Sequence, residues 1–176
     1  RQMCIRDRND LQVINGFNWS IEVVHTPGHL ADHLCFSVID KNILFSGDIV
    51  MGWTSTLISP PDGDVGQYFN SLDKLLNRSD NVYLPGHGLQ VEDAKTYVTK
   101  LKKHRMEREN QILSILKIRP LNSYQIANKI YKNQPQPIIY AGRRNVFAHL
   151  INLLERDLIC CDGAISPDNY FEFINK

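Results

Sequence analysis

The sequence predicts an α/β fold built from two parts of different character. The first half contains short runs of β-branched and aromatic residues between Gly- and Pro-containing turns, a pattern typical of β-strands. The second half contains longer stretches with the apolar spacing of helices. The charge changes at the same point: residues 1–91 hold 6 Lys and Arg against 10 Asp and Glu, whereas residues 92–176 hold 14 against 9. An acidic part joined to a basic part predicts two modules with different surfaces.

The overall composition excludes several classes of protein. Hydrophobic residues make up 43% of the 176 residues and charged residues 22%, so the chain is neither disordered throughout nor fibrous. No apolar run approaches the roughly 18 residues that a membrane span needs, which predicts no membrane partner. The four cysteines are too few and too scattered for a disulfide framework, and Cys160 and Cys161 are adjacent. We therefore expect a cytoplasmic protein in a reducing compartment.

The N-terminal segment does not look native. The chain opens with Arg1 instead of Met, and its first octapeptide, RQMCIRDR, resembles translated adapter sequence at the edge of a fragmentary assembly. It has no signal-peptide pattern of basic, apolar and small residues. We expect residues 1–8 to be foreign to the fold and the true N-terminus to be missing.

The first half predicts a small sheet and one helix. The strands are bounded by turn residues, and Asp40-Lys41-Asn42 separates two of them as a hairpin. Asp64 is placed to cap a helix whose apolar residues share one face. The expected elements are strands at Trp19–His25, Leu34–Ile39, Ile43–Ser46 and Val82–Leu84, and a helix from Asp64 to about Asn77.

The second half predicts helices followed by a hairpin. A long helix with acidic residues in its first turn and basic residues later suits the helix dipole. The expected elements are helices at Glu92 to about Lys117, Ser123–Tyr131 and Arg143–Arg156, then a hairpin of Leu158–Cys161 and Tyr170–Ile174. Helix, helix and hairpin is the order of a winged helix. The predicted organisation is a partial α/β domain at 9–100, a linker helix at 101–118 and a winged-helix-like domain at 119–176.

Three short motifs carry most of the chemical information. His25-Thr26-Pro27-Gly28-His29, Ser46-Gly47-Asp48 and Pro85-Gly86-His87-Gly88 each place a metal-capable side chain where a predicted strand ends in a turn. Imidazole suits zinc and similar metals, and a carboxylate can bridge two of them. Each motif alone has an ordinary explanation as a turn, but their occurrence together and in this order indicates a metal site.

The three motifs resemble the second half of the metallo-β-lactamase-fold hydrolases. In that family the second His of HTPGH binds one metal, the Asp of SGD bridges both metals, and the His of PGHG binds the second. The resemblance therefore implies metal-ligating roles for His29, Asp48 and His87, and implies two divalent metal ions, with zinc as the expected metal. His25 is not a usual ligand, and we expect it to orient the turn.

The sequence departs from this family at one important point. The family also needs an H-x-H-x-D-H motif in its N-terminal half, and the chain contains none. The resemblance thus predicts the C-terminal half of an αββα metallo-β-lactamase sandwich, followed by a small winged-helix domain. With half of the dinuclear site absent, we expect the isolated chain to be inactive and to bind metal weakly.

Further residues resemble one subgroup of the family. A subgroup with a winged-helix tail, which includes β-lactamase-like endoribonucleases, resembles this chain at three further places. These are Asp32-His33 after the first motif, His104-Arg105 in the long helix, and His149-Leu150 in the C-terminal part of the chain. His33 is a candidate catalytic residue that hydrogen-bonds substrate or a metal ligand; the alternative is a capping or packing role. The loop Trp53–Ser59 either lines the substrate cleft or only connects elements.

The basic tail permits two interpretations. Lys129, Lys132, Arg143 and Arg144 are candidates for phosphate contacts with RNA or DNA, or belong to a solvated surface. Winged helices often pack against a partner domain and do not read nucleic acid. Phe171 and Phe173 share a face of a predicted strand, which is more typical of a core than of a base-stacking platform.

Three functions from different classes follow. The first is a hydrolase that uses a hydroxide activated by two metals on an ester, thioester or lactone, as in glyoxalase II, with the catalytic role assigned to Asp48. The second is an endoribonuclease or other phosphodiesterase with RNA as substrate. The third is a non-catalytic nucleic-acid-binding module. The sequence is compatible with a homo-oligomer, and it identifies neither the substrate nor the metal.

Overall fold

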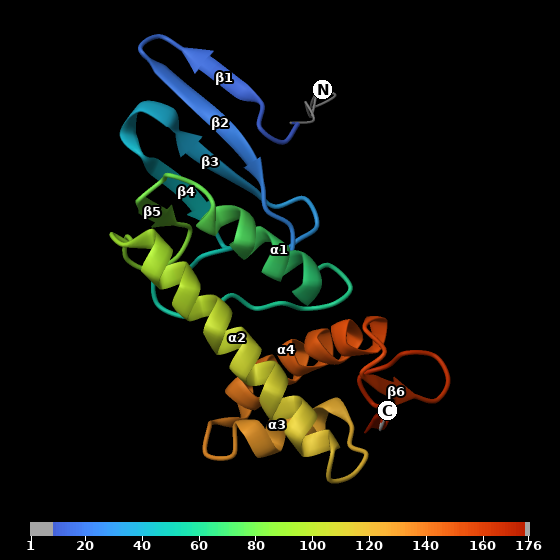
Figure 1. Ribbon diagram of the computed structural model, residues 1–176. Helices are drawn as coiled ribbons and strands as arrows, with labels where there is room; N and C mark the ends of the chain where they lie inside the picture. The colour runs from blue at the N-terminus through green and yellow to red at the C-terminus, as the bar shows by residue number, and fades with distance from the viewer. Residues whose placement is uncertain (1–8, 175–176) are drawn as a thin grey trace, which may run out of the picture.

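The computed structural model describes residues 9–174; the expectation for residues 1–8 lies outside them. The first part is a five-stranded sheet in the order β1-β2-β3-β4-β5, with one helix, α1, between β4 and β5 (Figure 1). Neighbouring strands from β1 to β4 are antiparallel, and β5 is parallel to β4. The elements are β1 (Val13–Gly16), β2 (Trp19–His25), β3 (Leu34–Val38), β4 (Ile43–Gly47), α1 (Val65–Leu76) and β5 (Val82–Pro85).

The strand directions decide where the site forms. Because β3 runs antiparallel to both β2 and β4, and β5 runs parallel to β4, the strands β2, β4 and β5 all point the same way. Their carboxyl ends therefore meet at one edge of the sheet. The three sequence motifs follow these three ends.

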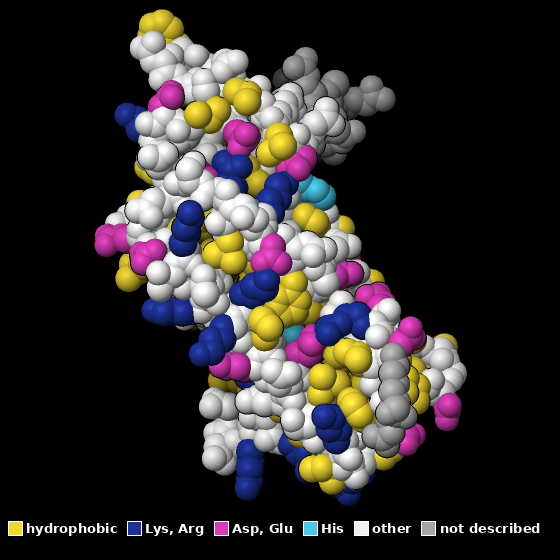
Figure 2. All heavy atoms as spheres, in the orientation of Figure 1, with side chains coloured by type: hydrophobic (Ala, Val, Ile, Leu, Met, Phe, Trp, Pro, Cys, Tyr) yellow, Lys and Arg dark blue, Asp and Glu magenta, His cyan; other side chains and the backbone are white. Residues whose placement is uncertain are grey.

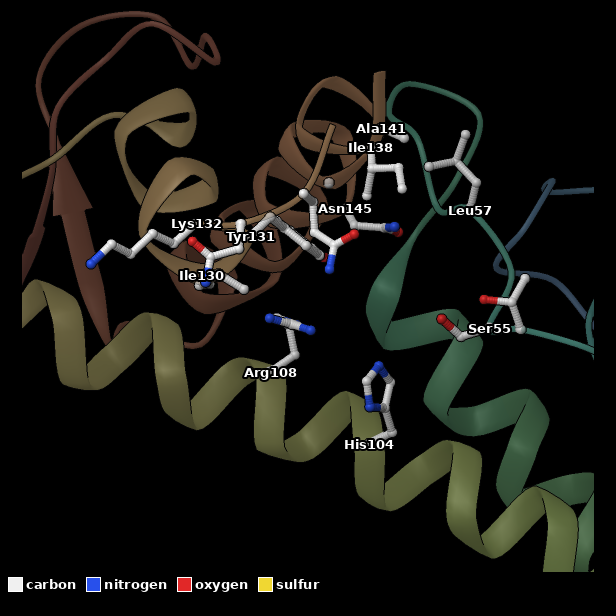
Figure 3. A pocket seen from close by; sticks show the side chains of 14 residues that line it. Ser55, Leu57, His104, Arg108, Ile130, Tyr131, Lys132, Ile138, Ala141 and Asn145 are labelled. Atoms are coloured by element: carbon white, nitrogen blue, oxygen red, sulfur yellow. The ribbon is translucent and has the colours of Figure 1, made fainter. Parts of the chain in front are cut away.

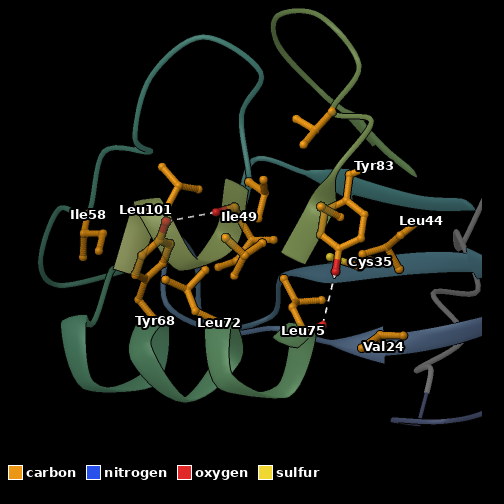
Figure 4. Packing of buried hydrophobic residues seen from close by; sticks show 14 of the residues in the cluster. Val24, Cys35, Leu44, Ile49, Ile58, Tyr68, Leu72, Leu75, Tyr83 and Leu101 are labelled. Carbon is orange, nitrogen blue, oxygen red and sulfur yellow. Dashed lines mark hydrogen bonds between the residues drawn. The ribbon is translucent and has the colours of Figure 1, made fainter. Parts of the chain in front are cut away.

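The helix α1 packs the first core. Asp64 caps it by accepting a hydrogen bond from the backbone N–H of Gln67 at 2.7 Å, as predicted. Two buried tyrosines anchor the packing through their hydroxyls: Tyr68 donates to the carbonyl of Ile49 at 3.1 Å, and Tyr83 donates to that of Leu75 at 3.3 Å (Figure 4). Both hydroxyls thus satisfy a polar atom inside an otherwise apolar core.

The predicted strands are confirmed, with one addition. Strand β1 was not predicted, because its sequence, VING, ends in residues that are typical of turns. It pairs with β2 through a tight connection in which Asn18 adopts a positive φ of 62°. The predicted turn at Asp40-Lys41-Asn42 contains a short 3₁₀ turn, Ile39–Lys41, that ends at Asn42 in the left-handed region.

The second part consists of three helices and a hairpin. They are α2 (Ala94–Leu116), α3 (Ser123–Ile130), α4 (Gln136–Glu155), β6 (Ile159–Cys161) and β7 (Phe171–Phe173). A capping box at the start of α3 joins Asn122 and Gln125 in both directions. The hairpin packs into a second core through Phe171, which is fully buried. Phe171 and Phe173 therefore contribute to packing.

Two helix boundaries differ from the prediction. The predicted start of α4 at Arg143 is wrong by about two turns, since the helix begins at Gln136. Pro135 and Pro137 predicted a linker, but proline is tolerated in a first turn, where the backbone N–H has no helical partner. The helix α2 begins at Ala94, so Asp93 is its N-cap and not a member of the first turn.

The helix α2 connects the two parts. Its first half contributes Val98 and Leu101 to the core beneath the sheet, and its second half contributes Ile112 and Leu116 to the core of the helical part. In Figure 1 it crosses the molecule from the sheet to α3. None of the described helices combines the length and apolar character that a membrane crossing requires.

Candidate active site

The ends of β2, β4 and β5 bring three predicted residues together. His29 lies in the turn after β2, Asp48 directly follows β4, and His87 follows β5. The Nε2 atom of His29 lies 3.9 Å from Oδ2 of Asp48, and Nε2 of His87 lies 3.7 Å from its Oδ1. Asp48 therefore stands between two imidazoles, one oxygen toward each. The His29 side chain is a quarter exposed and that of His87 about two thirds exposed.

The chemistry of these donors fits a divalent metal. The distances are too long for hydrogen bonds and close to the separation of roughly 3.4 Å between two ligands on one tetrahedral metal ion. His29 Nδ1 lies 2.7 Å from the backbone carbonyl of Leu57. Nδ1 must carry the proton to donate there, so Nε2 keeps its lone pair toward Asp48. Within residues 9–174, however, no group of three or more His, Cys, Asp or Glu is arranged to hold a metal ion by itself.

His33 holds the backbone of the central carboxylate. The N–H of Asp48 donates to Nε2 of His33 at 3.1 Å, which makes Nε2 an acceptor and leaves the proton on Nδ1. Nδ1 faces the hydroxyl of Thr26 at 2.9 Å. Burial lowers the pKa of His33, which keeps the ring neutral and preserves this pattern at neutral pH. In this structure, both ring nitrogens of His33 are thus used within the chain.

Two glycines make room around Asp48. Gly47 has a φ of +50°, and a Cβ there would lie 2.6 Å from Nε2 of His33. A Cβ on Gly86 would lie 2.6 Å from Oδ1 of Asp48. Both contacts are closer than real Cβ atoms allow, so the SGD and PGHG motifs need their glycines for space as well as for turn geometry.

The loop after Asp48 is held by the second part of the chain. The side-chain Oδ1 of Asn145 in α4 accepts the backbone N–H of Ile58 at 2.9 Å and Nη1 of Arg105 in α2 at 3.1 Å. Arg105 is almost fully buried and also donates to the carbonyl of Thr56. The loop in turn presents the Leu57 carbonyl to His29. We call the pair Arg105 and Asn145 the loop clamp.

Sequence reasoning missed the role of the loop clamp. Arg105 stood out only as part of a subgroup pattern, and Asn145 carried no signal. Their partners are 49 and 87 residues away in the chain, and only the packing of α2 and α4 against the loop brings them there. His25 has a simpler role, since its Nε2 lies 2.9 Å from the carbonyl of Ala31 and closes the turn that carries His29.

The basic candidates of the tail do not gather at this site. Lys132, Lys129 and the pair Arg143–Arg144 border three separate hollows. Arg143 is engaged within the chain, because Nη2 contacts Asp168 at 2.5 Å and Nε donates to the Ser123 hydroxyl at 3.0 Å. On the face shown in Figure 2, Lys and Arg side chains are scattered among Asp and Glu.

The comparisons with known proteins agree with this arrangement of strands and loops. Residues 3–87 match the family model described as the Metallo-beta-lactamase superfamily. The matched residues make up just under half of the chain. His29, Asp48 and His87 all lie within the matched segment.

Proteins similar to this chain include animal and fungal proteins. The Beta-lactamase-like protein 2 homolog of Caenorhabditis elegans is 29% identical over 155 residues, which cover 88% of this chain and 49% of the relative. An Aspergillus chevalieri protein named atrochrysone carboxyl ACP thioesterase is 30% identical over 116 residues, which cover 63% of this chain and 36% of the relative. The chain spans about half the length of the first of these relatives.

A solved structure shows the same fold over nearly the whole chain. The beta-lactamase domain protein from Burkholderia ambifaria superposes with a TM-score of 0.86 over 96% of this chain and 52% of its own, at 18% identity. The chain therefore has the same mixed α/β fold as that beta-lactamase domain protein, and the likeness extends over the helices that follow β5.

Proposed function

We propose that this chain supplies part of the active site of a metal-dependent hydrolase. The observation that carries the proposal is the position of the Asp48 carboxylate between His29 and His87 at the shared end of three strands. A pair of divalent metal ions, when bound, supplies Lewis-acid polarisation and lowers the pKa of water. We propose zinc for this role, because imidazole and carboxylate ligands suit it.

The residues of this chain have distinct roles in the proposal. His29 and His87 would each hold one metal ion, and Asp48, with one carboxylate oxygen toward each imidazole, would contribute to both. His33 acts on the position of Asp48 through its backbone N–H and does not itself bind the metal. The proton on His29 Nδ1 is fixed by the Leu57 carbonyl, which makes the imidazole a better ligand.

The remaining ligands are proposed to come from elsewhere in the whole protein. Three donors from this chain make up half of a dinuclear site, and the chain spans about half the length of a curated relative. An H-x-H-x-D-H motif outside this segment would complete the site, so the segment alone would be inactive. We also propose a cytoplasmic location for the protein.

The substrate is proposed to be an ester or thioester. A relative bears a thioesterase name, which supports this class. The alternative of an endoribonuclease has less support, because the four basic candidates are divided among three separate hollows and Arg143 is paired within the chain. We propose that α3, α4 and the β6–β7 hairpin form a winged-helix module whose role is to pack against the catalytic part.

The substitution Asp48→Asn tests the proposal in the full-length protein. It removes the charge that holds two cations while changing the side-chain volume little, so metal content and thioester hydrolysis should both fall, by about tenfold or more. Metal content is measured by mass spectrometry and hydrolysis with short acyl thioesters. The matched control is Asp40→Asn, an exposed residue in the turn before β4, at the opposite end of this strand from Asp48. Normal metal content and rate in Asp48→Asn would refute the assignment.

A further inference from the structure

A cavity of about 660 Å³ lies beside the loop clamp, between the loop after Asp48 and the helices α2 and α4 (Figure 3). Its volume is in the range of pockets that hold small organic molecules. The Leu57 side chain forms part of its wall, and the Leu57 carbonyl contacts His29 Nδ1 at 2.7 Å. The cavity and the proposed metal site therefore share one loop.

The wall of the cavity contains two cationic side chains, Arg108 and Lys132, and no carboxylate. Arg108 rises from α2 into it, and its guanidinium lies 4.7 Å from the centre of the Tyr131 ring, which fixes its plane. One of its nitrogens donates to Gln111 at 2.9 Å, and within the described part of the chain Arg108 forms no ion pair. A cation that is held in place without a carboxylate is suited to an anionic ligand.

Asn145 presents a second donor to the cavity. Its Oδ1 is occupied by Ile58 and Arg105, and the hydrogen bonds of the described residues include none from its Nδ2. Asn145 lines the cavity opposite Arg108, as Figure 3 shows. The Nδ2 group of Asn145 is thus available to a ligand, while its Oδ1 atom holds the loop after Asp48.

Apolar side chains form another part of the wall, and they favour a ligand with an apolar body. Leu57, Ile130, Ile138 and Ala141 face the same space. Lys132 stands at the rim, with its ammonium directed away from Arg108 in Figure 3. One fixed cation in a bounded cavity suits a single anionic group on a small molecule, whereas a nucleic-acid strand needs several cations along a track.

We propose that this cavity binds an organic anion with an apolar body, through Arg108 and the Nδ2 group of Asn145. The binding itself is independent of the proposed hydrolase function. The inference that the anion is a charged group of the substrate rests on that function, because it requires the ester to reach from the cavity to the site at His29.

Hexyl phosphate is a suitable probe, and hexanol is the uncharged control of the same chain length. Binding to the full-length protein is measured by calorimetry. We expect saturable binding of hexyl phosphate, none of hexanol, and about tenfold weaker binding in Arg108→Gln. The matched control Arg119→Gln removes an exposed arginine outside the cavity and should change affinity by less than about twofold. Because Arg108→Gln could also disturb the fold, an NMR shift of the Asn145 side-chain amide on titration of the unmodified protein provides a second measurement.

Three results would overturn the proposal. The first is the absence of saturable binding. The second is loss of binding when metal is removed with EDTA, which would place hexyl phosphate at the metal instead. The third is displacement by single-stranded RNA together with equal weakening in Arg108→Gln and Arg119→Gln, which would indicate a nucleic-acid surface. If Asp48→Asn keeps its metal while hexyl phosphate still binds as expected, the proposed function fails and the cavity proposal stands.

Discussion

Position 47 requires glycine for two separate reasons. Its left-handed backbone disfavours any side chain, and an added methyl group would also meet the His33 imidazole at 2.6 Å. Since His33 accepts the N–H of Asp48, the clash would displace the carboxylate as well. Gly47 thus permits the left-handed backbone conformation and also leaves room for the His33 imidazole.

The variant Gly47→Ala should therefore lose about 2 kcal/mol of unfolding free energy, the sum of backbone strain and imidazole displacement. Gly163→Ala separates the two causes, because Gly163 also has a positive φ but nothing lies within 4 Å of its added Cβ. That control should lose only about 1 kcal/mol. Chemical denaturation measures both, and equal losses would show that His33 does not constrain Gly47.

His149 is a second residue with a large expected effect. It is fully buried in α4, and neither ring nitrogen has a hydrogen-bond partner among the described residues. Burial, followed by the nearby charge of Arg105, lowers its pKa to about 3. The unfolded imidazole, with a pKa near 6.5, takes up a proton more readily than the folded one. The associated stability is therefore fully present above about pH 6.5 and is lost as the pH falls from there toward 3.

The variant His149→Leu should remove this pH dependence and, by removing two unpaired polar atoms, raise the unfolding free energy at pH 7 by roughly 1 kcal/mol. Between pH 7 and pH 5 the unmodified protein should lose up to about 2 kcal/mol relative to the variant. His149→Gln is a useful control, because it cannot titrate but keeps a polar group in the core. Parallel stability curves for the unmodified protein and His149→Leu would contradict the assignment.

At the scale of elements, the loop clamp joins α2 and α4 to the loop after Asp48. Asn145 provides the acceptor for the buried N–H of Ile58, and the same oxygen receives Arg105. Loss of that oxygen leaves two donors without a partner in a buried place, which is costly.

We expect Asn145→Ala to lose about 2 kcal/mol of stability and to speed hydrogen exchange at the Ile58 amide. Asn145→Asp keeps the acceptor oxygen and is the matched control; its Ile58 amide should stay protected. If both variants protect Ile58 equally, the oxygen of Asn145 does not hold the loop.

The elements also show what the sequence can and cannot predict. The strands that carry the three motifs were predictable, because β-branched runs end at clear turn residues such as those at Gly28 and Gly47. Strand β1 and the first turns of α4 were not, because Asn15, Gly16 and Pro137 are locally ambiguous and tertiary contacts decide their conformation. The loop clamp could not be predicted from the sequence, because no local pattern around Arg105 or Asn145 specifies a partner in a distant loop.

For the molecule as a whole, the main question is whether the two cores unfold together. The helix α2 contributes to both cores, and Ala148 of α4 lies in the core beneath the sheet. With a shared helix and the loop clamp between them, we expect one cooperative transition in the full-length protein.

Hydrogen exchange during a urea titration tests this expectation. Leu101→Ala in the first core and Leu116→Ala in the second should each lower the midpoint for peptides of both parts, at a cost of about 2–4 kcal/mol. A variant that shifts only the peptides of its own core would show that the parts unfold independently.

The loop clamp also bears on how such proteins can be recombined. A laboratory chimera that keeps the sheet and exchanges everything after residue 118 would retain Arg105 but receive a foreign residue in place of Asn145. The graft would then leave Ile58 without its acceptor and loosen the carbonyl that orients His29. The tail and residues 56–58 should therefore be exchanged together, from the same parent protein.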